Sequence, residues 1–294
     1  YAETGINGIW LQGLLYQLVP FRFAPEKSAG WEVRIDSLNQ LIERAKAYGI
    51  GVYLYLNEPR AMDSAFFEAH PGLRGECEGD FYAMCTSRPD VQDYLYSGMK
   101  TLFEHAPDLA GYFTISMSEN LTNCFSRAGA GGPACPNCKD RKPWEVVAEV
   151  NNLMAKGAHA AAPGAKAIAW NWGWKEAWAD KVIDSLTEGQ TVQCTSEEGL
   201  KTTVGGIAGR VVDYTISQPG PGEKSAANWR AAKAAGHEIC AKVQVNCTWE
   251  LAAIPFIPVL SSVEKHIHNL MNEGISNFQL SWTLGGCPSP NLML

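Results

Sequence analysis

Apolar strand-like segments alternate with amphipathic helix-like segments along this chain, and this alternation limits its fold more than any other feature. Segments such as VYLYL and AIAW are apolar almost throughout, as parallel strands covered by helices require. The expected strands are Gly8–Leu15, Gly51–Asn57, Gly111–Ser118, Lys166–Trp172, Thr191–Ser196, Val211–Ser217, Glu238–Asn246 and Ser276–Thr283. The expected helices, with apolar residues three and four positions apart, are Arg34–Tyr48, Asp90–His105, Pro143–Ala162, Lys175–Leu186, Ser225–Gly236 and Leu260–Gly274.

Such alternation indicates either a doubly wound sheet or a (β/α)8 barrel. No G-x-G-x-x-G motif follows a strand, which disfavours a dinucleotide-binding sheet. Six expected strands instead end in polar or aromatic residues, and in a (β/α)8 barrel such ends converge on the face that carries the active site. The sequence therefore predicts an α/β fold of the (β/α)8 TIM-barrel class. The six ends are Asn57-Glu58, Ser118-Glu119-Asn120, Asn171-Trp172, Ser196-Glu197-Glu198, Asn246 and Ser281-Trp282.

The two ends of the sequence have the character of interrupted helices. Tyr1–Gly5 reads as the tail of a helix closed by glycine, and residues 290–294 as the start of another. We expect residues 1–294 to be a single catalytic barrel domain of a longer chain, without the barrel's first strand and last helix. Val211–Ser217 leaves two alternatives, because no helix separates it from the preceding strand: a true barrel strand, or a side hairpin with the first barrel strand before Tyr1.

Composition and charge restrict the partners of the chain. Of 294 residues, 46% are hydrophobic and 19% charged, which allows a large buried core. A net charge of −7 disfavours a nucleic-acid surface, and no apolar run is long enough to span a membrane. The nine cysteines do not have the pattern of a small disulfide scaffold, which favours a reducing, cytoplasmic compartment. Nothing in the sequence indicates an oligomeric state.

Three glutamates lie at or just beyond expected strand ends: Glu119, Glu197 and Glu250. Cleavage of a glycosidic bond needs two carboxyl groups, one to protonate the leaving oxygen and one to act as nucleophile or to activate water. Glutamates on separate strand ends can face each other across the mouth of a barrel, so these three are the candidates for the pair. Glu198 should point away from Glu197, because neighbouring strand residues face opposite sides. Each glutamate could instead form a surface ion pair.

Polar and aromatic side chains at the same strand ends suit a sugar, whose hydroxyls need hydrogen-bonding partners and whose C–H faces stack on rings. The alternatives are turn formation for the asparagines and core packing for the tryptophans, the latter favoured for Trp170. The predicted substrate-binding residues are Asn57, Glu58, Asn120, Trp172, Asn246, Trp249 and Trp282.

The cysteines that follow the expected strand Gly111–Ser118 have metal-ligand spacing. Cys135 and Cys138 form a Cys-x-x-Cys pair, Cys124 lies upstream, and Cys85 or Cys77 could supply a fourth ligand. Four thiolates would make a structural zinc site, with a disulfide or free thiols as alternatives. We expect no catalytic cofactor, because no histidine pair lies at strand ends and no phosphate loop, nucleophile elbow or Ser-His-Asp triad is present.

Four segments resemble glycoside hydrolase family 20, the (β/α)8 barrels of the β-N-acetylhexosaminidase type. They are GIGVYLYLNEP, GYFTISMSEN, AIAWNWGW and FQLSWTLGG. In that family the fourth strand ends in an Asp-Glu pair, whose Glu is the general acid and whose Asp orients the substrate's acetamide group. The resemblance implies that Glu119 is the acid, that Gly51–Asn57 is the third strand, and that Trp282 is the aromatic residue placed near the sugar by the last strand.

The residue before the acid departs from the family pattern, because Ser118 stands where the family has Asp. A hydroxyl cannot supply the charge that polarises an acetamide, which weakens the case for a substrate-assisted mechanism and an N-acetyl substrate. The leading hypothesis is an exo-acting glycoside hydrolase with a carbohydrate substrate and paired carboxylates. In this hypothesis Glu119 is the acid and Glu197 the second carboxylate, with Glu250 in reserve. The alternatives are a non-catalytic carbohydrate-binding barrel and a metal-dependent barrel hydrolase that uses the cysteines.

Overall fold

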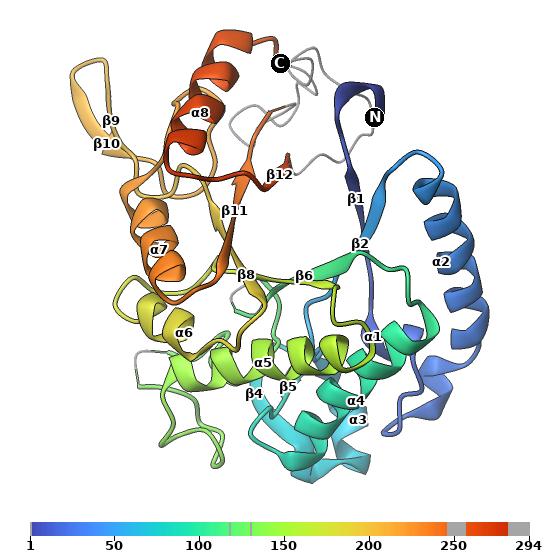
Figure 1. Cartoon of the computed structure of the whole chain (residues 1–294). Coiled ribbons are helices and arrows are strands. Elements are labelled where there is room, and N and C mark those ends of the chain that lie inside the picture. The colour runs from blue at the N-terminus through green and yellow to red at the C-terminus, as the bar shows by residue number, and fades with distance from the viewer. Residues whose placement is uncertain (1, 118, 130, 246–256, 282–294) are drawn as a thin grey trace. The chain divides into compact units, whose positions relative to one another are not determined.

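The computed structural model describes residues 2–117, 119–129, 131–245 and 257–281 (Figure 1). Its chain divides into two compact units: an N-terminal unit of residues 6–190, and a C-terminal unit that begins at Thr191 and includes residues 3–5. Within the described residues, no helix combines the length and the apolar character needed to cross a membrane.

Four parallel strands form the sheet of the N-terminal unit, in the order β1-β2-β6-β7. Because all four run the same way, their carboxyl ends lie at one edge of the sheet, which is the edge where the sequence predicts the site. Their bounds are Gly8–Gln12 for β1, Gly51–Tyr55 for β2, Gly111–Ile115 for β6 and Lys166–Trp170 for β7.

Helices connect these strands, and helix α4, Pro89–His105, packs beside helix α5, Pro143–Ala161 (Figure 1). Both α4 and α5 begin at a proline, whose fixed φ suits the first turn and whose missing N–H costs nothing there. A Cβ atom at Gly157 of α5 would lie 2.3 Å from the carbonyl oxygen of Tyr96 in α4, so the two backbones meet closely at a residue without a side chain. The helices are α1 Leu15–Leu18, α2 Trp31–Lys46, α4 Pro89–His105, α5 Pro143–Ala161 and α6 Ala179–Ser185, with 3-10 turns at Ala2–Thr4 and Pro25–Ser28.

The apolar spacing in α2 has the predicted effect. Leu38, Ile42 and Ala45 are buried and Leu41 is partly buried in the main core cluster of the unit, while the intervening polar positions face solvent. The expected helix Lys175–Leu186 is shorter in the structure, because α6 begins only at Ala179.

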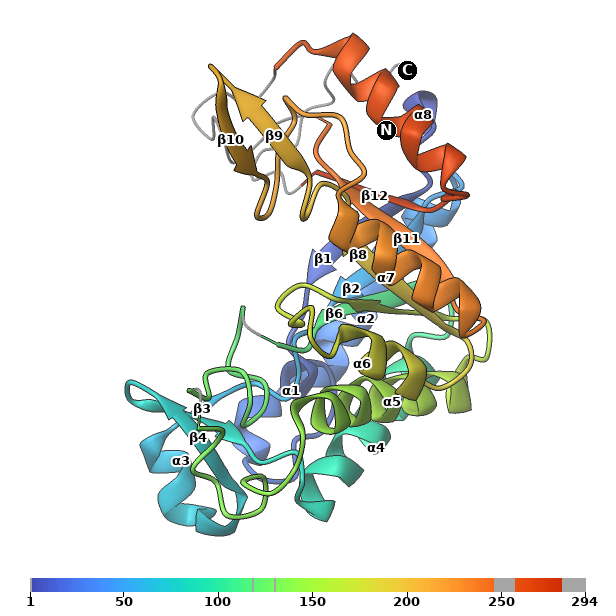
Figure 2. The ribbon, with the colours of Figure 1, turned by 90° about the vertical axis from the view of Figure 1, so that its left-hand side faces the viewer.

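A small antiparallel sheet follows β2, and the sequence did not predict it. It has the order β3-β5-β4, with strands Met62–Asp63, Phe81–Met84 and Arg74–Glu78. Helix α3, Ser64–Ala69, begins where the Asp63 carboxylate accepts a hydrogen bond of 2.9 Å from Phe66 N, and a 3-10 turn at Pro71–Leu73 leads into β4. The loop between β6 and α5 runs beside this sheet (Figure 2).

The C-terminal unit contains three parallel strands in the order β8-β11-β12. Helix α7 connects the first two, and its buried Trp229 donates a hydrogen bond of 3.0 Å to Cys240 O in β11. The bounds are β8 Gln190–Thr195, α7 Glu223–Ala234, β11 Glu238–Val243, α8 Leu260–Asn272 and β12 Phe278–Leu280.

Val211–Ser217 is not a strand, so the first of the two alternatives for this segment is wrong. The preceding residues form a hairpin of β9, Lys201–Val204, and β10, Ile207–Arg210. Its two-residue turn is Gly205-Gly206, with φ of 59° and 80°, the left-handed values that a tight hairpin turn requires. The glycines that exclude a helix here therefore close a side hairpin.

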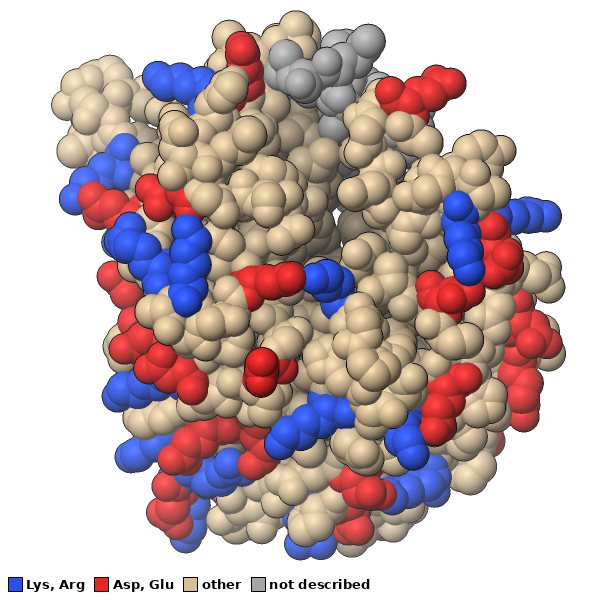
Figure 3. Space-filling model, viewed as in Figure 1, with Lys and Arg blue, Asp and Glu red and all other residues tan. Residues whose placement is uncertain are grey.

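Basic and acidic side chains are interspersed on the molecular face drawn in Figure 3. That distribution agrees with the net charge of −7 and gives this face no broad area of positive charge.

Candidate active site

Glu119 lies just beyond the carboxyl end of β6, next to the end of the neighbouring strand β2. The Tyr55 hydroxyl donates a hydrogen bond to Glu119 Oε2, and Asn57 Nδ2 lies 3.4 Å from the same oxygen. Asn57 Nδ2 also donates to the Tyr55 hydroxyl at 2.5 Å, so three side chains form a chain of hydrogen bonds that ends at the carboxylate.

Main-chain pairing fixes the amide of Asn57. Its Oδ1 accepts a hydrogen bond of 2.8 Å from Ile115 N, the last residue of β6, while Leu56 N donates to Phe113 O at 2.9 Å. Asn57 is fully buried, and with Oδ1 occupied its Nδ2 is turned toward Tyr55 and Glu119. The register of the two strands thus sets the position of the groups around the acid.

Aromatic rings pack around Tyr55, the residue whose hydroxyl binds Glu119. Tyr55 stacks on Phe113 with ring centroids 4.7 Å apart, and Trp10 packs edge-on against both rings. Glu119 is partly buried, and this burial raises the pKa of its carboxyl group because the charged form loses hydration. A carboxyl group with a raised pKa keeps its proton to a higher pH, as a general acid must.

Glu58 has a different environment from the one predicted for a substrate-binding residue. It is fully buried, and its two carboxylate oxygens accept hydrogen bonds from Leu15 N at 2.8 Å and Arg60 N at 3.1 Å. Burial raises the pKa of Glu58 to about 7. Its contacts join the first turn of α1 to the loop after β2, which is a structural role.

Arg60 is a residue that the sequence analysis missed. Its NH1 donates a hydrogen bond of 3.1 Å to Asn120 Oδ1, next to Glu119, so the loops after β2 and β6 are joined. The Nε and NH2 atoms of Arg60 are buried and have no hydrogen-bond partner among the described residues. Tyr55 was also missed, although it shares a face of the strand with Asn57 and the period of two would have identified it.

The end of β7 contributes Trp172 and Asn171. Of the three tryptophans there, Trp170 and Trp174 are buried and Trp172 is partly exposed, with its ring centroid 6.5 Å from that of Trp170. A turn at Gly173, with φ of 85°, reverses the chain after the strand and buries the outermost tryptophan. Asn171 is fully buried, and both of its side-chain polar atoms lack a partner in the described part of the chain.

Glu197 and Glu198, just beyond β8 in the C-terminal unit, separate as predicted. The Glu198 carboxylate pairs with Lys224 of α7, whereas Glu197 faces His266 of α8, with His266 Nε2 3.2 Å from Glu197 Oε1. Gly220 N donates to His266 Nδ1 at 2.5 Å, so the ring proton is on Nε2 and is directed at Glu197 and at Ser196 Oγ, 2.9 Å away.

Glu197 is almost completely buried, and among the described residues its carboxylate has no well-aligned hydrogen-bond donor. Buried carboxylates normally accept hydrogen bonds from several donors, and the Glu197 carboxylate departs from that pattern within the described part of the chain. The remaining predicted residues Asn246, Trp249, Glu250 and Trp282, together with Ser118, lie outside the described residues.

The four cysteines predicted as metal ligands come together in the N-terminal unit. The sulfur atoms of Cys85, Cys124, Cys135 and Cys138 all lie within 4.8 Å of one another, and all four residues are buried. Cys77, the alternative fourth ligand, is exposed on β4 and is not part of this cluster.

Comparison with known proteins gives structural matches only. No family model and no curated protein sequence matches the chain. A β-galactosidase from the haloarchaeon Halorubrum lacusprofundi matches at 14% identity with a TM-score of 0.58 over 96% of this chain and 49% of that one, so this chain spans about half its length. A second solved structure, a glycoside hydrolase, matches at 11% identity with a TM-score of 0.53 over 97% of this chain and 80% of that one.

A family 89 glycoside hydrolase from Clostridium perfringens matches at 12% identity with a TM-score of 0.50, over 92% of this chain and 27% of that one. At these identities the likeness establishes the fold and nothing finer. The chain is a partial (β/α) barrel with parallel strands and flanking helices, of the kind found in glycoside hydrolases. The predicted fold class is therefore confirmed, and the matches do not single out family 20.

Proposed function

We propose that this protein is an exo-acting glycoside hydrolase with Glu119 as its general acid. The observation that carries the proposal is the environment of Glu119: a partly buried carboxyl group with a raised pKa, at the carboxyl end of a barrel strand, bound by Tyr55 and Asn57. The barrel fold shared with glycoside hydrolases supports this reading.

The hydrogen bonds of Glu119 suit proton donation to a glycosidic oxygen. Tyr55 and Asn57 both direct N–H or O–H groups at Oε2, which leaves Oε1 to carry the proton toward a bound substrate. After transfer, the same donors stabilise the carboxylate that forms. The partly exposed side chains of Asn120 and Trp172 would then contact the sugar.

For the second carboxylate we propose Glu197, with Glu250 as the alternative. The support is the burial of Glu197, which among the described residues faces His266 and has no well-aligned donor, an arrangement that a purely structural carboxylate rarely has. His266 would hold the carboxylate in one orientation through its Nε2 proton. The resemblance to family 20 supports exo action, whereas Ser118 disfavours the substrate-assisted route of that family.

A screen of chromogenic aryl glycosides with the purified chain tests the activity. We expect hydrolysis of at least one glycoside, with release of single terminal sugars from an oligosaccharide of the same type. Proton NMR of the first product then gives the stereochemistry: retention corresponds to carboxyl groups about 5–5.5 Å apart and inversion to roughly 6.5–9.5 Å. Binding of sugars without hydrolysis of any glycoside would contradict the proposal and favour a carbohydrate-binding barrel.

Tyr55→Phe tests whether the hydroxyl positions the acid. We expect a modest fall in kcat and a shift of the alkaline limb of the kcat/KM profile to higher pH, because the carboxylate form of Glu119 loses a hydrogen-bond donor. Tyr96→Phe, which removes a hydroxyl from the exposed face of α4, is the matched control and should leave the profile unchanged. An alkaline limb that stays in place in Tyr55→Phe would show that this hydrogen bond does not act on the titrating group.

A further inference from the structure

Four buried thiols meet at one point between the small antiparallel sheet and the loop after β6. Cys85 directly follows β5, whereas Cys124, Cys135 and Cys138 lie in the loop that leads to α5. The sulfur of Cys85 is 3.6 Å from that of Cys135 and 3.7 Å from that of Cys138. Zn–S bonds of about 2.3 Å in a tetrahedron place sulfur atoms roughly 3.8 Å apart.

These distances fit a shared metal ion and not a disulfide, since bonded sulfur atoms lie about 2.05 Å apart. All four cysteines are free thiols. We propose that Cys85, Cys124, Cys135 and Cys138 bind one Zn²⁺ ion in a closed, structural tetrathiolate site. The proposal does not depend on the enzymatic activity.

Local backbone structure prepares the Cys-x-x-Cys pair. Cys138 N and Lys139 N both donate hydrogen bonds to Cys135 O, at 3.0 and 2.9 Å, and this tight turn places both sulfur atoms on one side of the loop. Asn137 Nδ2, between the two cysteines, points to the sulfur of Cys85 at 3.8 Å. The turn therefore supplies two ligands and a polar contact to a third.

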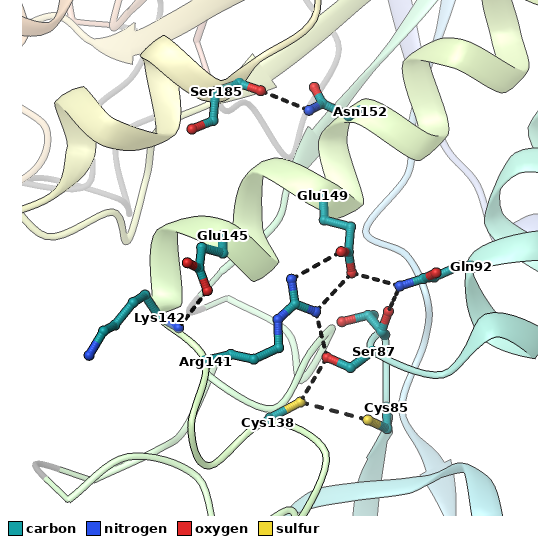
Figure 4. Close-up of polar contacts among 11 residues, drawn as sticks. Cys85, Ser87, Gln92, Cys138, Arg141, Lys142, Glu145, Glu149, Asn152 and Ser185 are labelled. Atoms are coloured by element: carbon teal, nitrogen blue, oxygen red, sulfur yellow. Dashed lines mark hydrogen bonds and ion pairs between the residues drawn. The ribbon is translucent and has the colours of Figure 1, made fainter.

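A second layer of side chains supports one of the sulfurs (Figure 4). Arg141 NH1 donates a hydrogen bond of 2.7 Å to Ser87 Oγ, and Ser87 Oγ lies 3.2 Å from Cys138 Sγ. Because the Ser87 oxygen accepts from Arg141, its own proton is available to the sulfur, which suits a thiolate. Outer contacts of this kind orient metal ligands.

Arg141 is itself held in place from α5 and α4 (Figure 4). Its guanidinium group binds Glu149 of α5 through two hydrogen bonds of 3.0 and 3.1 Å, and Gln92 of α4 donates to the same carboxylate at 2.9 Å. The cluster is thus connected to two helices of the barrel.

The backbone of β4 closes the cluster on another side. A Cβ atom at Gly75 would lie 2.6 Å from Cys124 Sγ, so the strand passes directly against this sulfur. With four protein ligands, all buried, no position is open for water or substrate, which distinguishes a structural zinc ion from a catalytic one. The hypothesis that the cysteines form a catalytic metal centre is therefore disfavoured.

The site would hold the loop that bears the proposed acid. Cys124 directly follows Asn123, whose Nδ2 donates to Ser116 O at 2.6 Å, just beyond β6. Thr122 Oγ1 donates to the same carbonyl oxygen at 3.0 Å. Glu119 lies between these anchored points, so the metal would fix the far end of the segment that carries it.

Metal analysis of the purified full chain tests the proposal. We expect close to one zinc ion per chain by mass spectrometry, and loss of most of this zinc in Cys124→Ser and Cys138→Ser. Cys77→Ser, which alters the exposed cysteine on the adjacent strand, is the matched control and should retain the metal. Absence of zinc from the wild-type chain, its replacement by iron, or equal loss in Cys77→Ser would overturn the assignment.

A milder variant and a titration cover the case in which the cysteine variants fail to fold. Ser87→Ala leaves all four ligands in place and should weaken zinc affinity by about 10- to 100-fold. In the wild-type chain, a mercurial thiol reagent should release one zinc ion as four thiols react, measured with a colorimetric chelator. An affinity unchanged by Ser87→Ala, together with release of no zinc as the thiols react, would contradict the site.

Discussion

Glu119→Gln is expected to lower kcat for glycosides with poor leaving groups by about 10²- to 10⁴-fold, the usual contribution of a general acid. The amide keeps the shape of the side chain and can still accept from Tyr55, but it has no proton to donate. KM should change little, because the loss falls on the transition state. Steady-state kinetics on the best substrate from the glycoside screen measures the effect.

The dependence of the hydrolysis rate on the leaving group distinguishes the loss of the general acid from a distorted substrate pocket. Dinitrophenyl glycosides need little protonation, so their hydrolysis should fall much less in Glu119→Gln than that of unactivated glycosides. Glu188→Gln, at an exposed position, is the control and should behave as the wild type. Equal losses for good and poor leaving groups would remove Glu119 from the role of acid, as would an unchanged rate.

The stability of the protein is expected to fall between about pH 5 and 7 because of Glu58. Burial raises the pKa of this carboxyl group from 4.5 to about 7, so the folded protein binds the proton more tightly than the unfolded chain does. The stabilisation that the Glu58 proton gives the fold is complete at pH values below the pKa of Glu58 in the unfolded chain. It is lost as the pH rises through the pKa of Glu58 in the folded protein. Its size is about 3 kcal/mol.

Glu58→Gln removes the titrating group and keeps the side-chain length, so its unfolding free energy should lack this pH dependence. Urea unfolding followed by tryptophan fluorescence from pH 5 to 8 measures both proteins, and the advantage of the wild type should shrink as pH rises. Glu188→Gln, at an exposed position, should follow the wild type. Parallel pH curves for wild type and Glu58→Gln would show that Glu58 does not titrate in this range.

The sequence predicted the seven parallel strands and the place of Glu119 beyond one of them, because both depend on local patterns, whereas the expected strand Val211–Ser217 is not formed. Buried parallel strands are continuous apolar runs, and polar residues that follow such runs must lie at the same sheet edge. Glu119 and Asn57 were placed at that edge in this way. Glu197 and Glu198 do face different partners, but they lie in a turn after β8, so the alternation of an extended strand is not the reason.

Residues whose role depends on distant contacts could not be predicted in the same way. Arg60 stands in a loop, and only the fold brings it to Asn120. Glu58 looked like a pocket residue because it follows Asn57, yet its carboxylate binds backbone amides of α1 and of its own loop. At β7, the strand pattern does not show which tryptophan beyond the strand reaches solvent, because the turn at Gly173 buries Trp174 and leaves Trp172 partly exposed.

The side chain of Asn57 gives the hydrogen bonds of the proposed site a fixed direction. Its Oδ1 is occupied by the main chain of β6, so the amide can present only its N–H side to Tyr55 and Glu119. Asn57 donates to the Tyr55 hydroxyl, and Tyr55 donates to the Glu119 carboxylate. All hydrogen bonds from Asn57 through Tyr55 to Glu119 therefore have the same donor-to-acceptor direction. The main-chain bond from Ile115 N to Asn57 Oδ1 sets that direction. An aspartate at position 57 would keep the shape but reverse this direction, and would set a second negative charge against the acid.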